Sequence, residues 1–581
     1  MDASIGTVGN SRPPPWIVLL AGFGRLTYAK VLIAMEGQGA YMSGGTMNRQ
    51  VLIRTAVFLA LLCPLVGVAI PSAAGTGAGG MHAGAGRAAW TGPVPKAHCG
   101  PGDRTESGLQ GQTTVEERFS GDSELGYNCN LQLVGQYTGE GAYSQDGPAY
   151  AGNCAYYGTD NNIPRQQHHG VTVVDASDPR HPRVTAFLDD TASALVPHET
   201  VQANSRRHLL VVAQAGGPGF AVYNISDCRH PVLEASIQLP GSQGHMGAFA
   251  PDGLTYYLTQ GFRGVGGFLY VVDLSDPSHP RELPPWQFQG DGRPHGLEVN
   301  PRGFEPGVAE GTRLYVGQQG VAGGTGTLAG PDGLVIEDVS DYQFRRPDPR
   351  IRIVGKLFWS DQGIAEAMIP VKIKGHPYLI STDEGGGAAG PGGLAGACAR
   401  GQALWGYPQI IDVRDETHPK IIARLMLEVS DPANCQQQVS ETPPDFCPGG
   451  PCPGTNLPAE SGSINYSEER CVANNPMNAT MLACSFQNAG LRVFDIRDPY
   501  HPKEIAYYKP PAVRTAFRPS SGSWAPGVDR TVDKIAAWVR WRKVGDQWEL
   551  WFVSDGNGFQ IVRFTNSFMA RNRSLFDSPG K

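Results

Sequence analysis

One short phrase recurs along the chain and constrains the fold more than any other feature. The copies are GVTVVDASDPRHPRV from Gly170, GFAVYNISDCRHPVL from Gly219, GFLYVVDLSDPSHPREL from Gly267, GLVIEDVSD from Gly333, YPQIIDVRDETHPKII from Tyr407 and GLRVFDIRDPYHPKEI from Gly490. GFQIVRFTNS from Gly558 is a divergent seventh copy. The first three copies lie 49 residues apart and the later ones lie further apart, because they carry insertions. Such a period predicts a repeat architecture in which each repeat is one supersecondary unit.

Each copy predicts a strand, a tight turn and a returning strand. The run before the Asp is β-branched and apolar, which is typical of a buried strand. Asp-Pro-x-His-Pro then predicts a reversal, since Asp bonds back to the backbone and Pro fixes φ. Two further strands precede each phrase, as in the segments starting at His198 and His245. Four antiparallel strands in roughly 45 residues indicate a propeller blade, whereas an α/β repeat would need amphipathic helices.

The sequence therefore predicts an all-β protein with one β-propeller, most simply of seven four-stranded blades; six or eight blades remain alternatives. NLQLVGQYTG, from Asn130, resembles the outer strand of a blade but has no turn before it. The C-terminal repeat has inner strands and no outer strand. We expect the N-terminal strand to complete the last blade, which removes the free edges of an open ring.

The phrase, read as VTVVD, LYVVD, PQIID and LRVFD, resembles the LVIVD-repeat family. The resemblance runs from about Asn130 to Thr565 and implies a prokaryotic cell-surface or secreted propeller. It implies no particular reaction. The second copy departs from the pattern at Asn224 and Cys228, and the fourth copy lacks His-Pro.

The N-terminus predicts export. From Met47 the chain has a basic start, an apolar run from Thr55 to Ile70 and a small-residue cleavage site at Ser72-Ala73-Ala74, which is the pattern of a Sec-type signal peptide. We expect a start at Met42 or Met47, so that residues 1–46 are an over-extended beginning. The other predicted segments are a signal peptide at 47–74, a Gly/Ala-rich linker and irregular segment at 75–128, the propeller at 129–567 and a tail at 568–581.

The chain has eleven cysteines, and removal of the signal peptide with Cys63 would leave ten. An even number suits disulfides in an oxidising compartment. Cys471 and Cys484 flank a predicted hairpin turn and are expected to pair across it. Cys129 and Cys154 flank the first inner strand and are expected to pair similarly. Cys435, Cys447 and Cys452 lie in one Pro-rich insertion, which a disulfide is expected to staple. Their spacing also fits zinc, but export favours disulfides.

Three histidines stand apart from those of the repeated turn. His198, His245 and His295 each occur where an inner strand is predicted to begin, and Glu366 takes that place in the fifth blade. We expect these four side chains at the channel mouth as candidate ligands of Zn, Cu or Fe, with Glu199 or Glu366 as a general base. Other polar side chains predicted at this mouth are Gln214, Gln260, Gln318, Asp383, Glu384, Gln487 and Asp555. The alternative is that these groups only satisfy backbone and hold water.

Two functions remain open at this stage. The first is an exported binding scaffold that presents loops 320–332, 384–405 and 428–465 to a protein or glycan. The second is a metal-dependent hydrolase or oxidase that acts on a small molecule at the channel mouth. A net charge of −7 argues against a nucleic-acid partner. We expect a monomer, secreted or loosely surface-associated, with no membrane span once the signal is removed.

Overall fold

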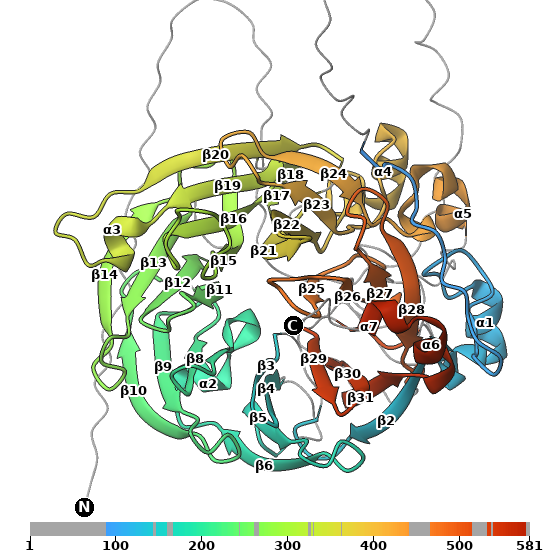
Figure 1. Ribbon diagram of the computed structural model, residues 1–581, viewed down its shortest axis with the longest axis horizontal. Coiled ribbons are helices and arrows are strands. Elements are labelled where there is room, and N and C mark those ends of the chain that lie inside the picture. Colours follow the sequence, from blue (N-terminus) through green and yellow to red (C-terminus); the bar gives the residue numbers. More distant parts are fainter. Residues whose placement is uncertain are drawn as a thin grey trace, which may run out of the picture. The chain divides into compact units, whose positions relative to one another are not determined.

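A computed structural model describes residues 89–576, with gaps at 143–146, 160–166, 243, 261–266, 323–326, 329, 362, 441–464, 514–531 and 536–537. The predicted signal peptide, the segment before it, Cys447 and Cys452 lie outside these residues. The described part is a ring of seven four-stranded antiparallel blades (Figure 1). The seven-bladed propeller predicted from the repeat is therefore confirmed.

The first four blades follow one another in the sequence. Blade 1 contains β3 (Ala149–Ala151), β4 (Cys154–Thr159), β5 (Gly170–Asp175) and β6 (Arg183–Leu188). Blade 2 contains β7 (Gln202–Asn204), β8 (Leu209–Ala213), β9 (Gly219–Asn224) and β10 (Val232–Gln238). Blade 3 contains β11 (Gly244–Phe249), β12 (Thr255–Gln260), β13 (Phe268–Asp273) and β14 (Arg281–Gln287). Blade 4 contains β15 (Arg293–Val299), β16 (Arg313–Gln319), β19 (Asp332–Asp338) and β20 (Arg352–Trp359), with a small hairpin, β17 (Val321–Ala322) and β18 (Thr327–Leu328), inserted.

The last three blades carry the insertions and the closure. Blade 5 contains β21 (Ala365–Ile373), β22 (His376–Asp383), β23 (Gln409–Asp412) and β24 (Lys420–Arg424). Blade 6 contains β25 (Arg470–Ala473), β26 (Met481–Phe486), β27 (Gly490–Asp495) and β28 (Lys503–Lys509), and β1 (Tyr127–Cys129) adds a fifth strand at its outer edge. Blade 7 contains β29 (Arg540–Val544), β30 (Gln547–Ser554), β31 (Gly558–Phe564) and the N-terminal β2 (Leu131–Tyr137).

The ring is closed by this N-terminal strand, as predicted. β2 pairs antiparallel with β31, from Leu131 opposite Phe564 to Tyr137 opposite Phe559. Apolar side chains fill the space between each pair of adjacent blades, and the cluster containing Tyr157, Trp551 and Phe559 joins blade 7 to blade 1. Burial of this apolar surface is the main stabilising term, and it is continuous around the ring.

Four disulfides link described residues, and they correct one predicted pairing and give Cys435 a partner outside its insertion. Cys471–Cys484 joins β25 to β26, as predicted. The pairing of Cys129 with Cys154 is wrong, because Cys129 bonds to Cys99 and Cys154 bonds to Cys228 in the turn of blade 2. Cys435 bonds to Cys398 rather than inside its own Pro-rich insertion. The sequence could not show these partners, because they lie 30, 74 and 37 residues away along the chain.

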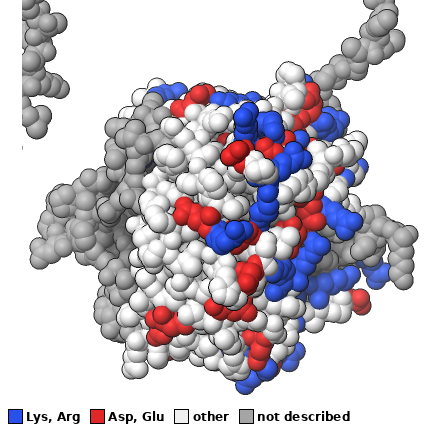
Figure 2. All heavy atoms as spheres, turned by 90° about the vertical axis from the view of Figure 1, so that its left-hand side faces the viewer, with Lys and Arg blue, Asp and Glu red and all other residues white. Residues whose placement is uncertain are grey.

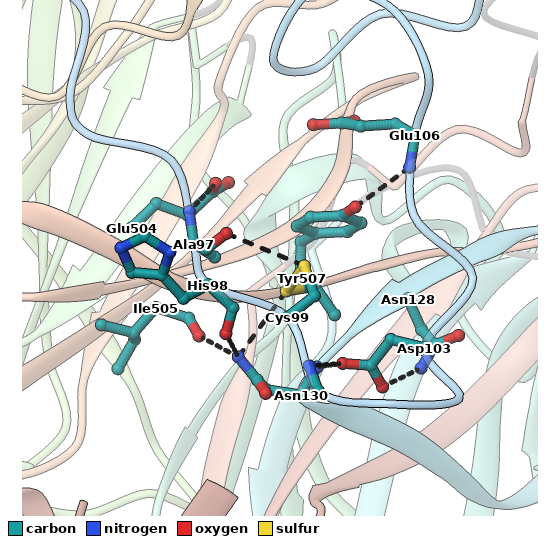
Figure 3. Close-up of a disulfide and its surroundings, with 12 residues drawn as sticks. Ala97, His98, Cys99, Asp103, Glu106, Asn128, Asn130, Glu504, Ile505 and Tyr507 are labelled. Carbon is teal, nitrogen blue, oxygen red and sulfur yellow. Dashed lines mark hydrogen bonds between the residues drawn. A yellow bond between two sulfur atoms is a disulfide. The ribbon is translucent and has the colours of Figure 1, made fainter.

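The segment before β1 lies along blades 5 and 6. It contains α1 (Val115–Ser120) and the 3-10 helix η1 (Asp122–Leu125), and Trp90 forms a bridge with Ala423 of β24. Figure 3 shows the Cys99–Cys129 disulfide, which joins this segment to β1, and the hydrogen bonds around it. Ala97 N–H donates to the Glu504 carboxylate, and Asn130 donates its side-chain amide to the carbonyls of His98 and Ile505. This segment is therefore part of the folded unit.

Short helices occupy the connections and the C-terminal end. They are α2 (Ala192–Leu195), η2 (His198–Thr200), α3 (Ser340–Gln343), η3 (Gly387–Ala389), α4 (Gly393–Arg400), η4 (Glu428–Ser430), η5 (Pro432–Asn434), α5 (Cys435–Ser440), α6 (Asn566–Arg571) and α7 (Arg573–Phe576). None of the helices in the described ranges is long and apolar enough to cross a membrane. On the side of the molecule seen in Figure 2, Lys and Arg lie beside Asp and Glu rather than in a field of one sign.

Candidate metal centre

Three consecutive inner strands carry an irregularity at the same place. The register shifts between Gly244 and Gly247 in β11, between Pro294 and Leu297 in β15, and between Ala365 and Met368 in β21. Bulges of this kind change the direction of a side chain and are common next to functional sites. The residues inside the three bulges include His245, His295 and Glu366, so the repeat places three metal-ligand side chains at one level of the ring.

Neighbouring strands hold the bulges in place. The Thr259 hydroxyl accepts a hydrogen bond from Met246 N–H at 3.2 Å, and the Thr382 hydroxyl accepts one from Ala367 N–H at 2.9 Å. Gly317 leaves room for the fifth blade, because a Cβ atom there would lie 1.8 Å from the carbonyl oxygen of Glu366. The backbone that carries Glu366 can therefore approach β16 closely only because residue 317 is glycine.

Two imidazoles and four carboxylates come together at this level. Their ligand atoms form three overlapping groups, within each of which all atoms lie within 4.8 Å of one another; the groups are Glu199, His245 and His295; His295, Glu366 and Glu384; and Glu199, Glu366, Glu384 and Glu469. Nε2 of His245 lies 3.8 Å from Oε2 of Glu199, and Nε2 of His295 lies 3.7 Å from Oε1 of Glu384. We call these six residues the channel cluster.

One guanidinium lies among these carboxylates. Arg470, the first residue of β25, is 2.9 Å from Oε2 of Glu199 and forms a second ion pair with Glu366. It also lies over the Trp538 ring, 5.2 Å from the ring centroid. Arg470 and Glu366 are 1% and 0% exposed, so their charges are removed from water. Oε1 of Glu366 has no hydrogen-bond partner among the described residues, which leaves a buried oxygen directed at the cluster.

A second layer of hydrogen bonds orients the ligands. Nδ1 of His295 lies 3.1 Å from the carbonyl of Ala365, which can only accept, so Nδ1 carries a proton and Nε2 is the nitrogen that faces Glu384. Ala365 N–H donates to Asp332 at 3.2 Å. Burial and the neighbouring carboxyl of Asp383 raise the pKa of Asp332 well above its usual range. Asp383 in turn accepts from the backbone of Gly363 and Ile364.

Another acid lies near the cluster on the inner strand of blade 4. Burial raises the pKa of Glu298 to about 7, and the charge of Arg470 acts in the opposite direction. Burial likewise raises the pKa of Glu468, next to Glu469 in the chain, well above its usual range. The surroundings of the channel cluster therefore favour the neutral form of these two carboxyl groups.

The predicted site residues fall into two sets. His245, His295, Glu366, Glu199 and Glu384 are brought together, whereas the side chain of His198, in η2, is outside the description. The remaining predicted channel-mouth residues form hydrogen bonds within the loops. The side chains of Gln214 and Gln260 accept from the backbone N–H groups of Gly219 and Phe268, and Gln318 accepts from Asp291 N–H and donates to the carbonyl of Pro331. Gln487 donates to the carbonyl of Glu384, and the buried Asp555 donates its N–H to the carbonyl of Lys534.

Sequence reasoning missed Glu469 and Arg470. Both come just before or at the start of the inner strand of blade 6, which is the place that His245, His295 and Glu366 take in theirs. The insertion that ends at residue 465 hid where this strand begins. The signal that could have found them is the run Glu468-Glu469-Arg470 immediately before an apolar strand.

Comparison with known proteins bears on the repeat. The sequence model of the LVIVD repeat matches residues 264–283, which contain β13 and the turn after it. This chain carries an LVIVD repeat. The match confirms the resemblance predicted from the recurring phrase. None of the curated proteins compared with this LVIVD-repeat chain matches it.

Solved structures similar to this LVIVD-repeat chain include two propellers. Sqt1 of Saccharomyces cerevisiae is 10% identical, with 75% of this chain and 99% of that chain covered and a TM-score of 0.42. The β-propeller domain of Cps50 (Swd1) from Myceliophteria thermophila is 10% identical, with 75% and 100% covered and a TM-score of 0.40. At these values the two structures say nothing about the function of the LVIVD-repeat chain.

Proposed function

We propose that this protein binds a transition metal at the channel cluster and uses it for hydrolysis or oxidation of a small substrate. The observation that carries the proposal is the gathering of donor atoms: ligand atoms of two imidazoles and four carboxylates form overlapping groups, and most of these side chains are buried. Burying charge costs several kcal/mol per ion, roughly, unless a counter-ion compensates it. A divalent cation supplies that compensation.

The types of donor atom limit which metal ions the site can bind. Imidazole nitrogen and carboxylate oxygen together suit Zn, Fe, Mn and Cu, whereas Ca and Mg prefer oxygen alone. Glu384 is the member with access to solvent, with 22% of its side chain exposed. A substrate or water would therefore approach the metal from the side of Glu384.

The chemistry follows from such a metal. A bound transition metal lowers the pKa of its water and polarises a substrate oxygen. Glu199 and Glu366 are grouped with the imidazoles, so their carboxylates would hold the metal rather than take a proton from that water. Arg470 would then remain as the positive group that faces developing negative charge.

A second role, as an exported binding scaffold, rests on a different part of the chain. The Cys398–Cys435 disulfide joins α4 to α5 outside the blades, so the insertions of blade 5 form a stapled surface. Together with the predicted signal peptide, this supports a partner-binding face outside the cytoplasm. The four disulfides are compatible with that location.

Elemental analysis tests the metal proposal. The protein is purified without a metal-affinity tag, and total first-row transition metal per chain is measured beside a His245→Ala/Glu366→Gln double variant. We expect at least one ion per chain in the parent and a large loss in the variant, with an unchanged circular dichroism spectrum. The control is His230→Ala, which removes an exposed turn histidine and should keep the metal. Parent protein without metal, even after reloading, would contradict the proposal.

A further inference from the structure

The two histidines of the channel cluster have an arrangement that a single metal ion does not explain. The rings of His245 and His295 are stacked, with centroids 4.8 Å apart and an angle of 8° between their planes. A metal ion lies close to the plane of the imidazole that binds it, about 2.0–2.1 Å from the nitrogen. An ion in the plane of one stacked ring lies well outside the plane of the other, so the two rings cannot both bind it well.

Each ring has a different carboxylate within 4 Å of its Nε2. The 3.8 Å between His245 and Glu199 and the 3.7 Å between His295 and Glu384 are separations typical of two donors on one ion, given bonds of about 2.0–2.2 Å. Glu366 joins His295 and Glu384 in one group, and Glu199, Glu366, Glu384 and Glu469 form another. The carboxylates therefore extend from one imidazole to the other.

From this geometry we infer that the channel cluster is a dinuclear centre, with one ion on His245 and Glu199 and a second on His295 and Glu384. The inference rests on the proposed metal-binding function. Ions in dinuclear sites lie about 3.5–4 Å apart, which fits ligand atoms that all lie within 4.8 Å in each group. Glu366 and Glu469 are then the carboxylates that bridge or complete the pair.

The donor set as a whole suits two ions. Four carboxylates with two histidines is the donor set of di-iron and di-manganese carboxylate sites in helical bundles, built here on the inner strands of a propeller.

The unpartnered oxygen of Glu366 also supports metal binding at the channel cluster. Oε1 of this fully buried residue has no hydrogen-bond partner among the described residues, while its other oxygen pairs with Arg470. A carboxylate with one oxygen on a cation, the other unpartnered and His295 in the same group of ligand atoms is placed to bind an ion.

Manganese loading tests the inference in the full chain. Metal is removed with a chelator, the protein is reloaded with Mn(II) and desalted, and bound manganese is counted while the low-temperature EPR spectrum is recorded. We expect about two Mn(II) per chain and an exchange-coupled spectrum. About one Mn(II) per chain with the spectrum of an isolated ion would overturn the dinuclear centre and leave the proposed function standing, whereas no bound metal would overturn both.

Two single variants separate the positions. His245→Ala should keep about one Mn(II), held by His295 and Glu384, and lose the coupling. Glu384→Gln, at the solvent side, should do the same from the other position and serves if His245→Ala does not fold. His230→Ala is the matched control and should keep two ions. Coupled manganese that survives both channel substitutions would contradict the assignment of the two positions.

Discussion

Blade 6 supplies an arginine to each of two buried ionic clusters, and the clusters differ in their composition. Arg492 lies 2.7 Å from Glu106 and 2.8 Å from Glu504, and Lys509 lies 3.3 Å from Glu106. Two cations thus meet two carboxylates, and the Tyr507 ring covers Arg492 at 4.5 Å. Arg470 pairs with Glu199 and Glu366, and the ligand atoms of these two residues are grouped with those of two further carboxylates and two imidazoles.

The two clusters are therefore expected to have different roles, one in stability and one in ligand binding. The Arg492 cluster is complete in itself, and three of its four charges fasten blade 6 to the N-terminal segment through Glu106. Its expected role is therefore to hold that segment. The Arg470 cluster instead gathers imidazole and carboxylate donor atoms that a metal ion can use. Buried charge of the same kind, in the same blade, thus predicts stability in one place and ligand binding in the other.

The largest expected effect comes from disrupting the Arg492 cluster, which consists of Arg492, Lys509, Glu106 and Glu504. Arg492→Ala leaves Glu106 and Glu504 buried without their main counter-charge, and should lower the free energy of unfolding by about 3–5 kcal/mol. Urea unfolding followed by tryptophan fluorescence measures it. Arg497→Ala, which removes a partly exposed ion pair with Asp495, is the control and should cost less than about 1 kcal/mol. Equal losses in the free energy of unfolding in both variants would contradict the structural role of the Arg492 cluster.

Removing metal should be the next largest effect, and it should act on the other cluster. With free metal several hundred times above Kd, binding stabilises the folded state by about 3 kcal/mol. Chelation should therefore lower the Tm of the parent protein and of Arg492→Ala alike. It should leave the Tm of His245→Ala/His295→Ala unchanged. A parent Tm that ignores chelator would argue that the Arg470 cluster needs no cation.

The Cys99–Cys129 disulfide should contribute somewhat less. It closes a loop of 30 residues beside the Arg492 cluster, and its removal should cost about 2–3 kcal/mol. The variant is Cys99→Ser/Cys129→Ser, with limited proteolysis of residues 89–126 as the measurement. We expect faster cleavage there and unchanged metal content. Cleavage that is no faster than in the parent would show that the ionic cluster alone holds the segment.

The smallest effect is a dependence on pH. Burial would raise the pKa of Glu106, but the charges and hydrogen bonds of Arg492 and Lys509 lower it to about 2. A lowered pKa in the folded state means stability that is present above about 4.5 and lost as pH falls towards 2. By pH 3 the loss should be about 1–2 kcal/mol. Glu106→Gln should flatten this part of the pH profile, and an unchanged slope in that variant would refute the assignment to Glu106.

The sequence predicted much of the fold and half of the centre. The repeat fixed the register of the inner strands, so the places of His245, His295 and Glu366 followed from counting residues. The bulges that turn these side chains inward have no mark in the sequence beyond Thr259 and Thr382. Glu469 and Arg470 were hidden behind an insertion. Glu106 was missed because a polar segment with no repeat gives no indication of the blade it contacts.

The closing strand has a consequence for how the chain is made. β2 is synthesised before any blade, yet its partner β31 lies more than 400 residues later. Blades 1 to 5 can form in order as their residues emerge, while β1 and β2 stay unpaired until β28 and β31 exist. Contacts of such long range are slow to form, so ring closure is the last event in folding. During that wait β2 is an open edge, and a chain that stops before residue 558 never receives the strand that covers it.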